Sequence, residues 1–319
     1  MHGSAREVEV AGRFAPSPTS DLHLGNLRTA LVAWLLARTT GREFRLRVED
    51  LDTQRVAAAP EVARRQLADL DALGLDHDGE VVWQSRRLDA YADAVAGLDT
   101  YPCYCTRREI AEAASAPHGD AFRPYPGTCL RLSASRRAEL EATRRPALRV
   151  RANGASSTVQ DLWAGDVTGT VDDFVVVRND GVPAYNLAVV VDDLAMGIDQ
   201  VCRGDDLLSS APRQAWLARQ LGGTSPGYAH VPLAVNPDGR RLAKRDGAVT
   251  LADLAGLGWS PAHVLTRLAR SLDLAAAGEP VTTAELLARF DPSALPREPW
   301  VVDARQPTAA AWENSRSTT

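Results

Sequence analysis

Residues 11–50 read AGRFAPSPTSDLHLGNLRTALVAWLLARTTGREFRLRVED, and this stretch predicts a strand, a helix and a second strand in succession. The apolar residues before Gly12 form the first predicted strand, which leads into a rigid loop with two prolines. The helix that follows carries apolar residues at helical spacing to about residue 38, and Gly41 ends it. Alternating apolar and charged residues at 44–49 then predict the second strand.

The same alternation of strands and helices continues along the chain. A second helix is predicted from Pro60 to Gly74, and strands joined by helical crossovers indicate a parallel sheet in an α/β fold. From about residue 101, prolines, cysteines and arginines interrupt the pattern, which indicates an insertion that closes with a hairpin over 175–185. The pattern resumes with a helix near 186–196, and the rest of the chain is predicted to end in helices and a disordered tail.

The composition is that of an ordinary globular protein. Of the 319 residues, 45% are hydrophobic and 24% are charged, which excludes a disordered, collagen-like or coiled-coil chain. No stretch approaches the ~20 apolar residues needed to span a bilayer, and no signal-peptide pattern opens the chain. We therefore expect a cytoplasmic protein that contacts no membrane. The net charge of −5 argues against a general nucleic-acid-coating protein.

Charged residues are distributed unevenly. Residues 101–151 hold ten arginines, no lysine and five acidic residues, and on charge alone a solvated face is favoured over a polyanion contact. Lys244 is the single lysine among 36 basic residues. Unless this is chance, it indicates a site that needs a compact ammonium group and not a guanidinium fork. Asp192 and Asp193 resemble a metal-binding pair, but we expect them on the exposed surface of a helix.

Three of the four cysteines lie close together in the sequence. Cys103 and Cys105 form a C-x-C pair and Cys129 follows, a pattern that favours metal binding over a disulfide framework. A closed zinc site needs four ligands, and His118 would suit the fourth position chemically. Three unligated thiols are the alternative. Cys202 is predicted to be a buried strand residue.

A phosphate site is predicted where the first strand leads into the first helix. Ligands bind at this position in open parallel sheets, and the helix N-terminus offers N–H groups to a phosphate. Gly25 lets a nucleotide approach the backbone, and His23 can donate a hydrogen bond to a phosphate oxygen. On these residues alone, a loop with a capping histidine is an equal alternative. Lys244, in a basic loop after a late strand, strengthens the case for a nucleotide.

Four blocks of sequence, taken in order, resemble the glutamyl-tRNA synthetase family of class I aminoacyl-tRNA synthetases. They are RFAPSPT at 13–19, LHLG at 22–25, RVEDLDTQR at 47–55 and RGDDLL at 203–208. The HLGN and RLAKR segments resemble the "HIGH" and "KMSKS" elements of these enzymes, with Asn26 at the fourth position of the first element and Lys244 in place in the second.

The resemblance implies a fold and a set of functional residues. It implies a Rossmann-like catalytic domain over 1–100 and 185–245, an inserted zinc-bearing acceptor-type subdomain over 101–184, and a short helical region over 246–319. The implied catalytic residues are His23 and Lys244, which stabilise charge on the triphosphate as it breaks. The implied contacts to ATP are His23, Gly25, Asn26 and Lys244. The implied contacts to glutamate are Arg13, Phe14, Ala15, Pro16, Ser17, Glu49, Tyr185 and Arg203. The implied ligands of one structural Zn²⁺ per chain are Cys103, Cys105, Tyr125 and Cys129.

The chain length indicates a branch of this family. After Arg245 the 319-residue chain has too few residues for the helical anticodon-binding region of ordinary glutamyl-tRNA synthetases. We therefore expect the shortened branch, which activates L-glutamate with ATP and Mg²⁺ and attaches it to the queuosine base at the wobble position of tRNA(Asp). We expect a monomer whose arginine-rich insertion grips the anticodon stem-loop. The alternatives are a minimal glutamyl-tRNA synthetase that charges the 3′ end, a non-catalytic paralogue that binds tRNA or amino acid, and a small-molecule nucleotidyltransferase.

Overall fold

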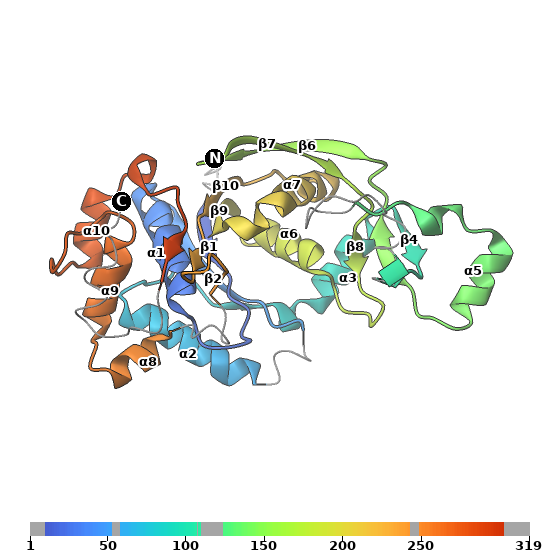
Figure 1. The fold of residues 1–319 in the computed structure, drawn as a ribbon. Helices are drawn as coiled ribbons and strands as arrows, with labels where there is room; N and C mark the ends of the chain where they lie inside the picture. Colours follow the sequence, from blue (N-terminus) through green and yellow to red (C-terminus); the bar gives the residue numbers. More distant parts are fainter. Residues whose placement is uncertain (1–9, 53–57, 107, 110–123, 243–248, 303–319) are drawn as a thin grey trace, which may run out of the picture. The chain divides into compact units, whose positions relative to one another are not determined.

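The computed structural model describes residues 10–52, 58–106, 108–109, 124–242 and 249–302. The chain divides into two compact units, and Figure 1 shows their elements coloured along the sequence. Unit 1 comprises Met1–Trp83, Gly197–Leu207 and Tyr228–Thr319. Unit 2 comprises Gln84–Met196 and Leu208–Gly227. The functional domain boundaries expected at residues 101, 185 and 246 stay a prediction.

Unit 1 is built on a parallel sheet, as the sequence predicts. Its strands are β1 (Ala11–Phe14), β2 (Glu43–Val48), β3 (Val82–Trp83), β9 (Ile198–Gly204) and β10 (Gly227–Val231). They lie in the order β3-β2-β1-β9-β10, and the pairs β1–β2, β1–β9 and β2–β3 are parallel. The register pairs Phe14 with Leu46 and Arg13 with Val201. The carboxyl ends of β1, β2 and β9 therefore lie along one edge of the sheet, where such sheets bind ligands.

Helix α1 (Leu24–Thr39) packs against β1 and β9, and its predicted apolar stripe is buried. Gly12 permits this close packing, because a Cβ atom on Gly12 would lie only 2.9 Å from the Cβ atom of Ala37. The prediction that Gly12 begins the proline-containing loop is wrong. Gly12 to Phe14 are strand residues, because their backbone pairs with strands on both sides.

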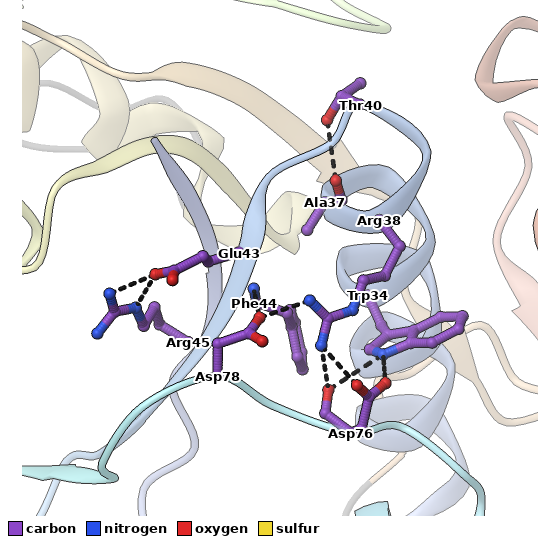
Figure 2. A network of polar contacts seen from close by, with 9 residues as sticks. All are labelled: Trp34, Ala37, Arg38, Thr40, Glu43, Phe44, Arg45, Asp76 and Asp78. Carbon is purple, nitrogen blue, oxygen red and sulfur yellow. Dashed lines mark hydrogen bonds and ion pairs between the residues drawn. The ribbon is translucent and has the colours of Figure 1, made fainter. Parts of the chain in front are cut away.

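A polar network joins α1 to the start of β2 (Figure 2). The indole Nε1 of Trp34 donates to the carboxylate of Asp76 at 2.9 Å, and Arg38 forms ion pairs with Asp76 and Asp78. Asp78 also accepts a 2.8 Å hydrogen bond from the backbone N–H of Phe44. Burial opposes ionisation of Asp78, but the hydrogen bonds from Phe44 and Arg38 outweigh it and hold the pKa of this carboxyl below its usual value. The network fixes the helix against the strand.

The second predicted helix and the helical C-terminal region are confirmed. They form α2 (Ala59–Ala72), α8 (Leu251–Gly256), α9 (Pro261–Arg270) and α10 (Thr283–Arg289), followed by a short 3₁₀ turn at Pro292–Ala294. The hydroxyls of Thr250, Ser260 and Thr282 cap α8, α9 and α10. In unit 1, α9 and α10 pack against α1, and β12 (Trp300–Val301) pairs with β11 (Ala234–Val235). The tail predicted to be disordered lies outside the described residues.

Unit 2 combines a small antiparallel sheet, a hairpin and helices. The sheet consists of β4 (Thr100–Cys103), β5 (Ala147–Val150) and β8 (Val175–Val177). The hairpin is formed by β6 (Ala155–Asp161) and β7 (Gly165–Val171). The helices are α3 (Leu88–Ala96), α5 (Ala134–Glu141), α6 (Tyr185–Ala195) and α7 (Ala211–Gln220), with 3₁₀ turns at Gln84–Arg86, Thr128–Arg131 and Asp205–Ser210. The last of these turns extends across the boundary between the units.

The hairpin predicted over 175–185 is confirmed but short, because Tyr185 already starts α6. Val177 and Pro183 form an antiparallel bridge, and the backbone N–H of Ala184 donates to the carbonyl oxygen of Val176 at 2.9 Å. The expected surface position of Asp192 and Asp193 is wrong. Asp193 is only 8% exposed, and Asp192 is 0% exposed and accepts hydrogen bonds from Gln84, Arg87 and Tyr91. These donors compensate for its desolvation and tie α6 to α3. Among the described residues, no helix has the length and apolar character that a membrane span requires.

Candidate active site and metal centre

The proline-containing loop after β1 is held from two sides. The side-chain amide of the buried Gln66, on α2, donates to the carbonyl oxygens of Ser17 at 3.2 Å and Ser20 at 2.7 Å. The backbone N–H of Glu49 donates to the carbonyl oxygen of Pro16 at 3.0 Å. The predicted glutamate contacts from Phe14 to Ser17 therefore lie directly beside the end of β2. Sequence reasoning missed Gln66, because one glutamine on a helix has no local signature.

His23 caps α1 and keeps one ring nitrogen for another partner. Its Nδ1 accepts hydrogen bonds from the backbone N–H groups of Gly25 at 3.1 Å and Asn26 at 3.3 Å. The Asn26 side chain accepts in turn from the backbone N–H of His23 at 3.2 Å. Burial, and then the positive charge of Arg241, lowers the pKa of His23 to about 4. The imidazole is therefore neutral near pH 7 with its proton on Nε2, a hydrogen-bond donor suited to a phosphate oxygen.

The chain on both sides of Lys244 is attached close to His23. Lys244 itself lies outside the described residues. On its N-terminal side, Leu242 donates from its backbone N–H to the carbonyl oxygen of Ala234 at 3.2 Å. Ala234 is next to α1, because a Cβ atom on Gly25 would lie 2.9 Å from the Cβ of Ala234. On the C-terminal side, Thr250 forms an antiparallel bridge with His23.

Three charged residues predicted to contact glutamate lie at the carboxyl ends of adjacent strands in unit 1. Arg13 is buried on β1 and donates to the carbonyl oxygen of Cys202 at 3.2 Å. Glu49 follows β2 and forms a 3.2 Å ion pair with the buried Arg47. Arg203 is buried near the end of β9. Two cations and one anion at one sheet edge suit a zwitterionic amino acid.

Arg203 has a buried partner that the sequence did not reveal. Its Nε donates to Nε2 of His230 at 3.0 Å, and its Nη2 donates to the carbonyl oxygen of Leu207 at 3.3 Å. The tyrosine predicted to contact glutamate, Tyr185, begins α6 in unit 2 and is 41% exposed. Its contact with the same substrate stays a prediction.

The three predicted cysteine ligands and Tyr125 form one cluster in unit 2. The sulfur atoms of Cys103, Cys105 and Cys129 all lie within 4.8 Å of one another. The Tyr125 hydroxyl lies 3.5 Å from the sulfur of Cys103 and 3.8 Å from that of Cys105. It also accepts a 2.8 Å hydrogen bond from the backbone N–H of Cys129. The alternative ligand His118 lies outside the described residues.

This donor set fits a tetrahedral zinc ion. Zn–S bonds of about 2.3 Å put thiolate sulfurs about 3.8 Å apart in a tetrahedral site, close to the 3.5 Å between Cys105 and Cys129. Burial raises the pKa of Cys105 to about 12, and burial with hydrogen bonds to Cys129 and Cys103 raises the pKa of Tyr125. Burial also opposes ionisation of Cys129, but hydrogen bonds from Tyr125 and Tyr104 lower its pKa. A bound cation would offset the cost of ionising the other groups.

Residues around the cluster hold Tyr125 in place. The guanidinium of Arg149 lies 3.6 Å from the centre of the Tyr125 ring. The backbone N–H of Tyr125 donates to Asp172 at 2.9 Å, and Asp172 pairs with Arg213 of α7 at 2.6 Å. Such outer contacts orient the ligands of a metal site. The remaining cysteine, Cys202, is a buried strand residue, as predicted.

Comparison with known proteins identifies the family. A family model described as "tRNA synthetases class I (E and Q), catalytic domain" matches residues 9–306. The chain belongs to this family of class I tRNA synthetases. It is therefore an aminoacyl-tRNA synthetase-like ligase, and as a class I synthetase it uses ATP with Mg²⁺.

Relatives and solved structures agree with this assignment. A protein of Nocardia farcinica named glutamyl-Q tRNA(Asp) synthetase is 60% identical over 304 residues, which cover 93% of this synthetase and 94% of the relative. A protein of the same name from Cutibacterium acnes is 60% identical over 271 residues, or 85% and 78% of the two chains. The crystal structure of a glutamate tRNA ligase from Elizabethkingia meningosepticum, in complex with its amino acid, matches with a TM-score of 0.75 and 27% identity. That match covers 97% of this synthetase and 69% of the ligase.

Proposed function

We propose that this synthetase activates L-glutamate with ATP and transfers it to the queuosine base at the wobble position of tRNA(Asp). The names of relatives at 47–60% identity support this substrate. One structural observation carries the activation step. The chain on both sides of Lys244 is attached beside the capped, neutral His23 at the N-terminus of α1. A triphosphate bound between the two segments would meet an imidazole donor on one side and an ammonium group on the other.

In the first step, an oxygen of the glutamate α-carboxylate attacks the α-phosphorus of ATP. The bond from this phosphorus to the oxygen bridging the α- and β-phosphates breaks, and pyrophosphate leaves with the bonding electrons. ATP enters as its Mg²⁺ complex, and the metal neutralises part of the triphosphate charge. The Nε2–H of His23 donates to a phosphate oxygen, and the N-terminus of α1 at Gly25 and Asn26 faces the same anion. Lys244 offsets the charge that builds on the leaving pyrophosphate.

Glutamate is recognised by its charges. Arg13 and Arg203 meet carboxylate groups, because guanidinium groups form paired hydrogen bonds with carboxylates. Glu49 meets the substrate ammonium group, and the buried Arg47 orients Glu49 through their 3.2 Å ion pair. The loop from Phe14 to Ser17 lines the same position, and Tyr185 offers its hydroxyl to the substrate side chain.

In the second step, a hydroxyl of the queuosine base attacks the carbonyl carbon of glutamyl-adenylate, and AMP leaves. The arginine-rich insertion would hold the tRNA through its phosphates. Helix α5 has no buried residue, and Arg136 and Arg137 on it are exposed. We assign one structural Zn²⁺ to the Cys103, Cys105, Tyr125 and Cys129 cluster, which supports this part of the chain.

Glutamate transfer to matched tRNAs tests the proposal. Pyrophosphate exchange with glutamate and ATP, without tRNA, reports activation. Labelled glutamate is then offered to queuosine-bearing tRNA(Asp), to the same tRNA with guanosine at the wobble position, and to tRNA(Glu). We expect label only on the first, and it should persist when the 3′-terminal adenosine has been removed. Label that requires this adenosine would instead identify a minimal glutamyl-tRNA synthetase, and no exchange at all would indicate a non-catalytic paralogue.

A further inference from the structure

A buried histidine lies against the arginine that we assign to glutamate. Arg203 is on β9 and His230 is on the neighbouring strand β10, and the two side chains are 6% and 4% exposed. The Nε of Arg203 lies 3.0 Å from Nε2 of His230. None of the sequence blocks includes His230, and its contact with Arg203 brings together residues 27 positions apart.

The chemistry of this contact fixes the state of the histidine. Arginine remains protonated in proteins, so its Nε always donates. Nε2 of His230 must therefore accept, which requires a neutral imidazole with its proton on Nδ1. The stacked ring of Tyr228, 5.7 Å away at an interplanar angle of 14°, holds the imidazole in this orientation. The same tyrosine ring lies 5.4 Å from the guanidinium carbon of Arg203.

Two acceptors define the direction of the guanidinium plane. Nε donates to His230 and Nη2 donates to the carbonyl oxygen of Leu207, so both contacts use the same side of the group. A planar guanidinium that is held at two of its nitrogens has a fixed orientation. The side chain is thus oriented before a carboxylate arrives, which lowers the entropic cost of binding.

We propose that His230 is a positioning residue that orients Arg203 for the carboxylate of the amino-acid substrate. This proposal rests on the proposed function, in which Arg203 contacts glutamate. His230 acts through Arg203 and does not itself touch the substrate. Removal of its acceptor nitrogen would leave a buried guanidinium N–H without this partner and would let Arg203 turn away from the glutamate site.

Two substitutions separate the contribution of the acceptor nitrogen of His230 from that of its ring. His230→Phe keeps a ring to stack on Tyr228 but removes the acceptor, whereas His230→Gln keeps an acceptor oxygen and removes the ring. We expect His230→Phe to raise the KM for glutamate in pyrophosphate exchange by about tenfold to a hundredfold. The KM for ATP should change little, and His230→Gln should restore most of the glutamate affinity. His77→Phe, at an exposed position, is the matched control and should change neither constant.

A double-mutant cycle tests whether His230 acts through Arg203. In the Arg203→Ala background, His230→Phe should have no further effect on the KM for glutamate. An unchanged KM in His230→Phe alone would overturn this proposal only. An unchanged KM in Arg203→Ala would overturn both this proposal and the assignment of Arg203 to glutamate. Equal losses for glutamate and ATP in His230→Phe would indicate a general structural role and would also overturn the proposal.

The tautomer of His230 gives a measurement that needs no activity and no stable variant. Nitrogen-15 spectra of the wild-type synthetase should show the Nδ1–H tautomer, with Nε2 unprotonated. A signal from the Nε2–H tautomer or from a doubly protonated ring would contradict the hydrogen bond to Arg203, and the proposal would fall with it.

Discussion

The backbone N–H of Leu24 donates a 3.0 Å hydrogen bond to the carbonyl oxygen of Val249. Leu24 directly follows His23, and Val249 follows the segment that carries Lys244. Two residues that are far apart in the sequence and are both expected to contact ATP are therefore linked through their neighbours. The proposal that a triphosphate binds between them can therefore be tested by substitutions at His23 and at Lys244.

Lys244→Ala should reduce glutamate-dependent pyrophosphate exchange by on the order of a hundredfold or more, because it removes the charge that stabilises the leaving pyrophosphate. The melting temperature should stay near that of the wild type. Lys244→Arg keeps the charge but replaces a compact ammonium with a planar fork, so we expect it to recover little activity. Wild-type exchange in Lys244→Arg would show that the single lysine of this chain has no special chemical role.

His23 should titrate far below the ordinary range of histidine. Its pKa is lowered to about 4, first by burial and then by the charge of Arg241, whereas a histidine in the unfolded chain titrates near 6.5. Between these two values the unfolded chain binds the extra proton, so the free energy of unfolding should fall as the pH falls from about 6.5 to about 4. An NMR titration of the His23 ring protons checks the midpoint.

His23→Asn is the matched variant for this measurement. Asparagine can still cap α1 but does not titrate, so the stability advantage of the wild type over this variant should shrink as the pH falls through the same window. The variant also lacks Nε2–H, so its exchange activity should be low at every pH. A His23 midpoint near 6.5, or an active His23→Asn variant, would contradict the role assigned to this residue.

The purified chain should contain about one zinc ion, and its retention should require the Cys103, Cys105, Tyr125 and Cys129 cluster of unit 2. Cys129→Ser should abolish zinc retention, because a hydroxyl is a much poorer zinc ligand than a thiolate. Tyr125→Phe keeps the ring under Arg149 and should retain zinc more weakly. Cys202→Ser is the control, since Cys202 lies on β9 in unit 1. Metal analysis after dialysis against a chelator measures these differences, and full zinc in Cys129→Ser would exclude the site.

Arg136→Ala should weaken binding of queuosine-bearing tRNA(Asp) without changing pyrophosphate exchange. Loss of one phosphate contact should also reduce the salt dependence of binding by about one unit of log–log slope. Arg64→Ala is a matched control, because Arg64 forms the same kind of exposed ion pair as Arg136. Arg64 pairs with Glu61 three residues away on α2, and Arg136 pairs with Glu139 three residues away on α5. Equal losses of tRNA affinity in the two variants would argue that α5 makes no specific contact.

Elements with strong local patterns could be predicted from the sequence. The apolar spacing of α1 and its end before Gly41 were sufficient. Strand β12 could not be found, because two residues have no periodicity and the partner of Trp300, Ala234, is distant in the chain.

Residues of the candidate site could be predicted where they belong to short sequence motifs. They were missed where their role depends on contacts between distant parts of the chain. The cysteine spacing predicted a cluster, and the structure brings the three sulfurs together. Asp192 was expected on a surface because charged residues are usually exposed, but three donors from other elements compensate for its burial. His230 gave no signal, because a histidine in an apolar strand looks the same with or without an arginine beside it.

The absence of a side chain at Gly25 lets α1 and β11 approach closely, at the position that we propose for ATP. A methyl group there would meet the Cβ of Ala234 at 2.9 Å, closer than such atoms approach in real proteins. Relief of that clash would push β11 away from α1, and the strand would carry with it the chain that leads to Lys244. The spacing between the two segments that we propose to enclose the triphosphate thus depends on the absence of a side chain at residue 25, and even a methyl group there would change it.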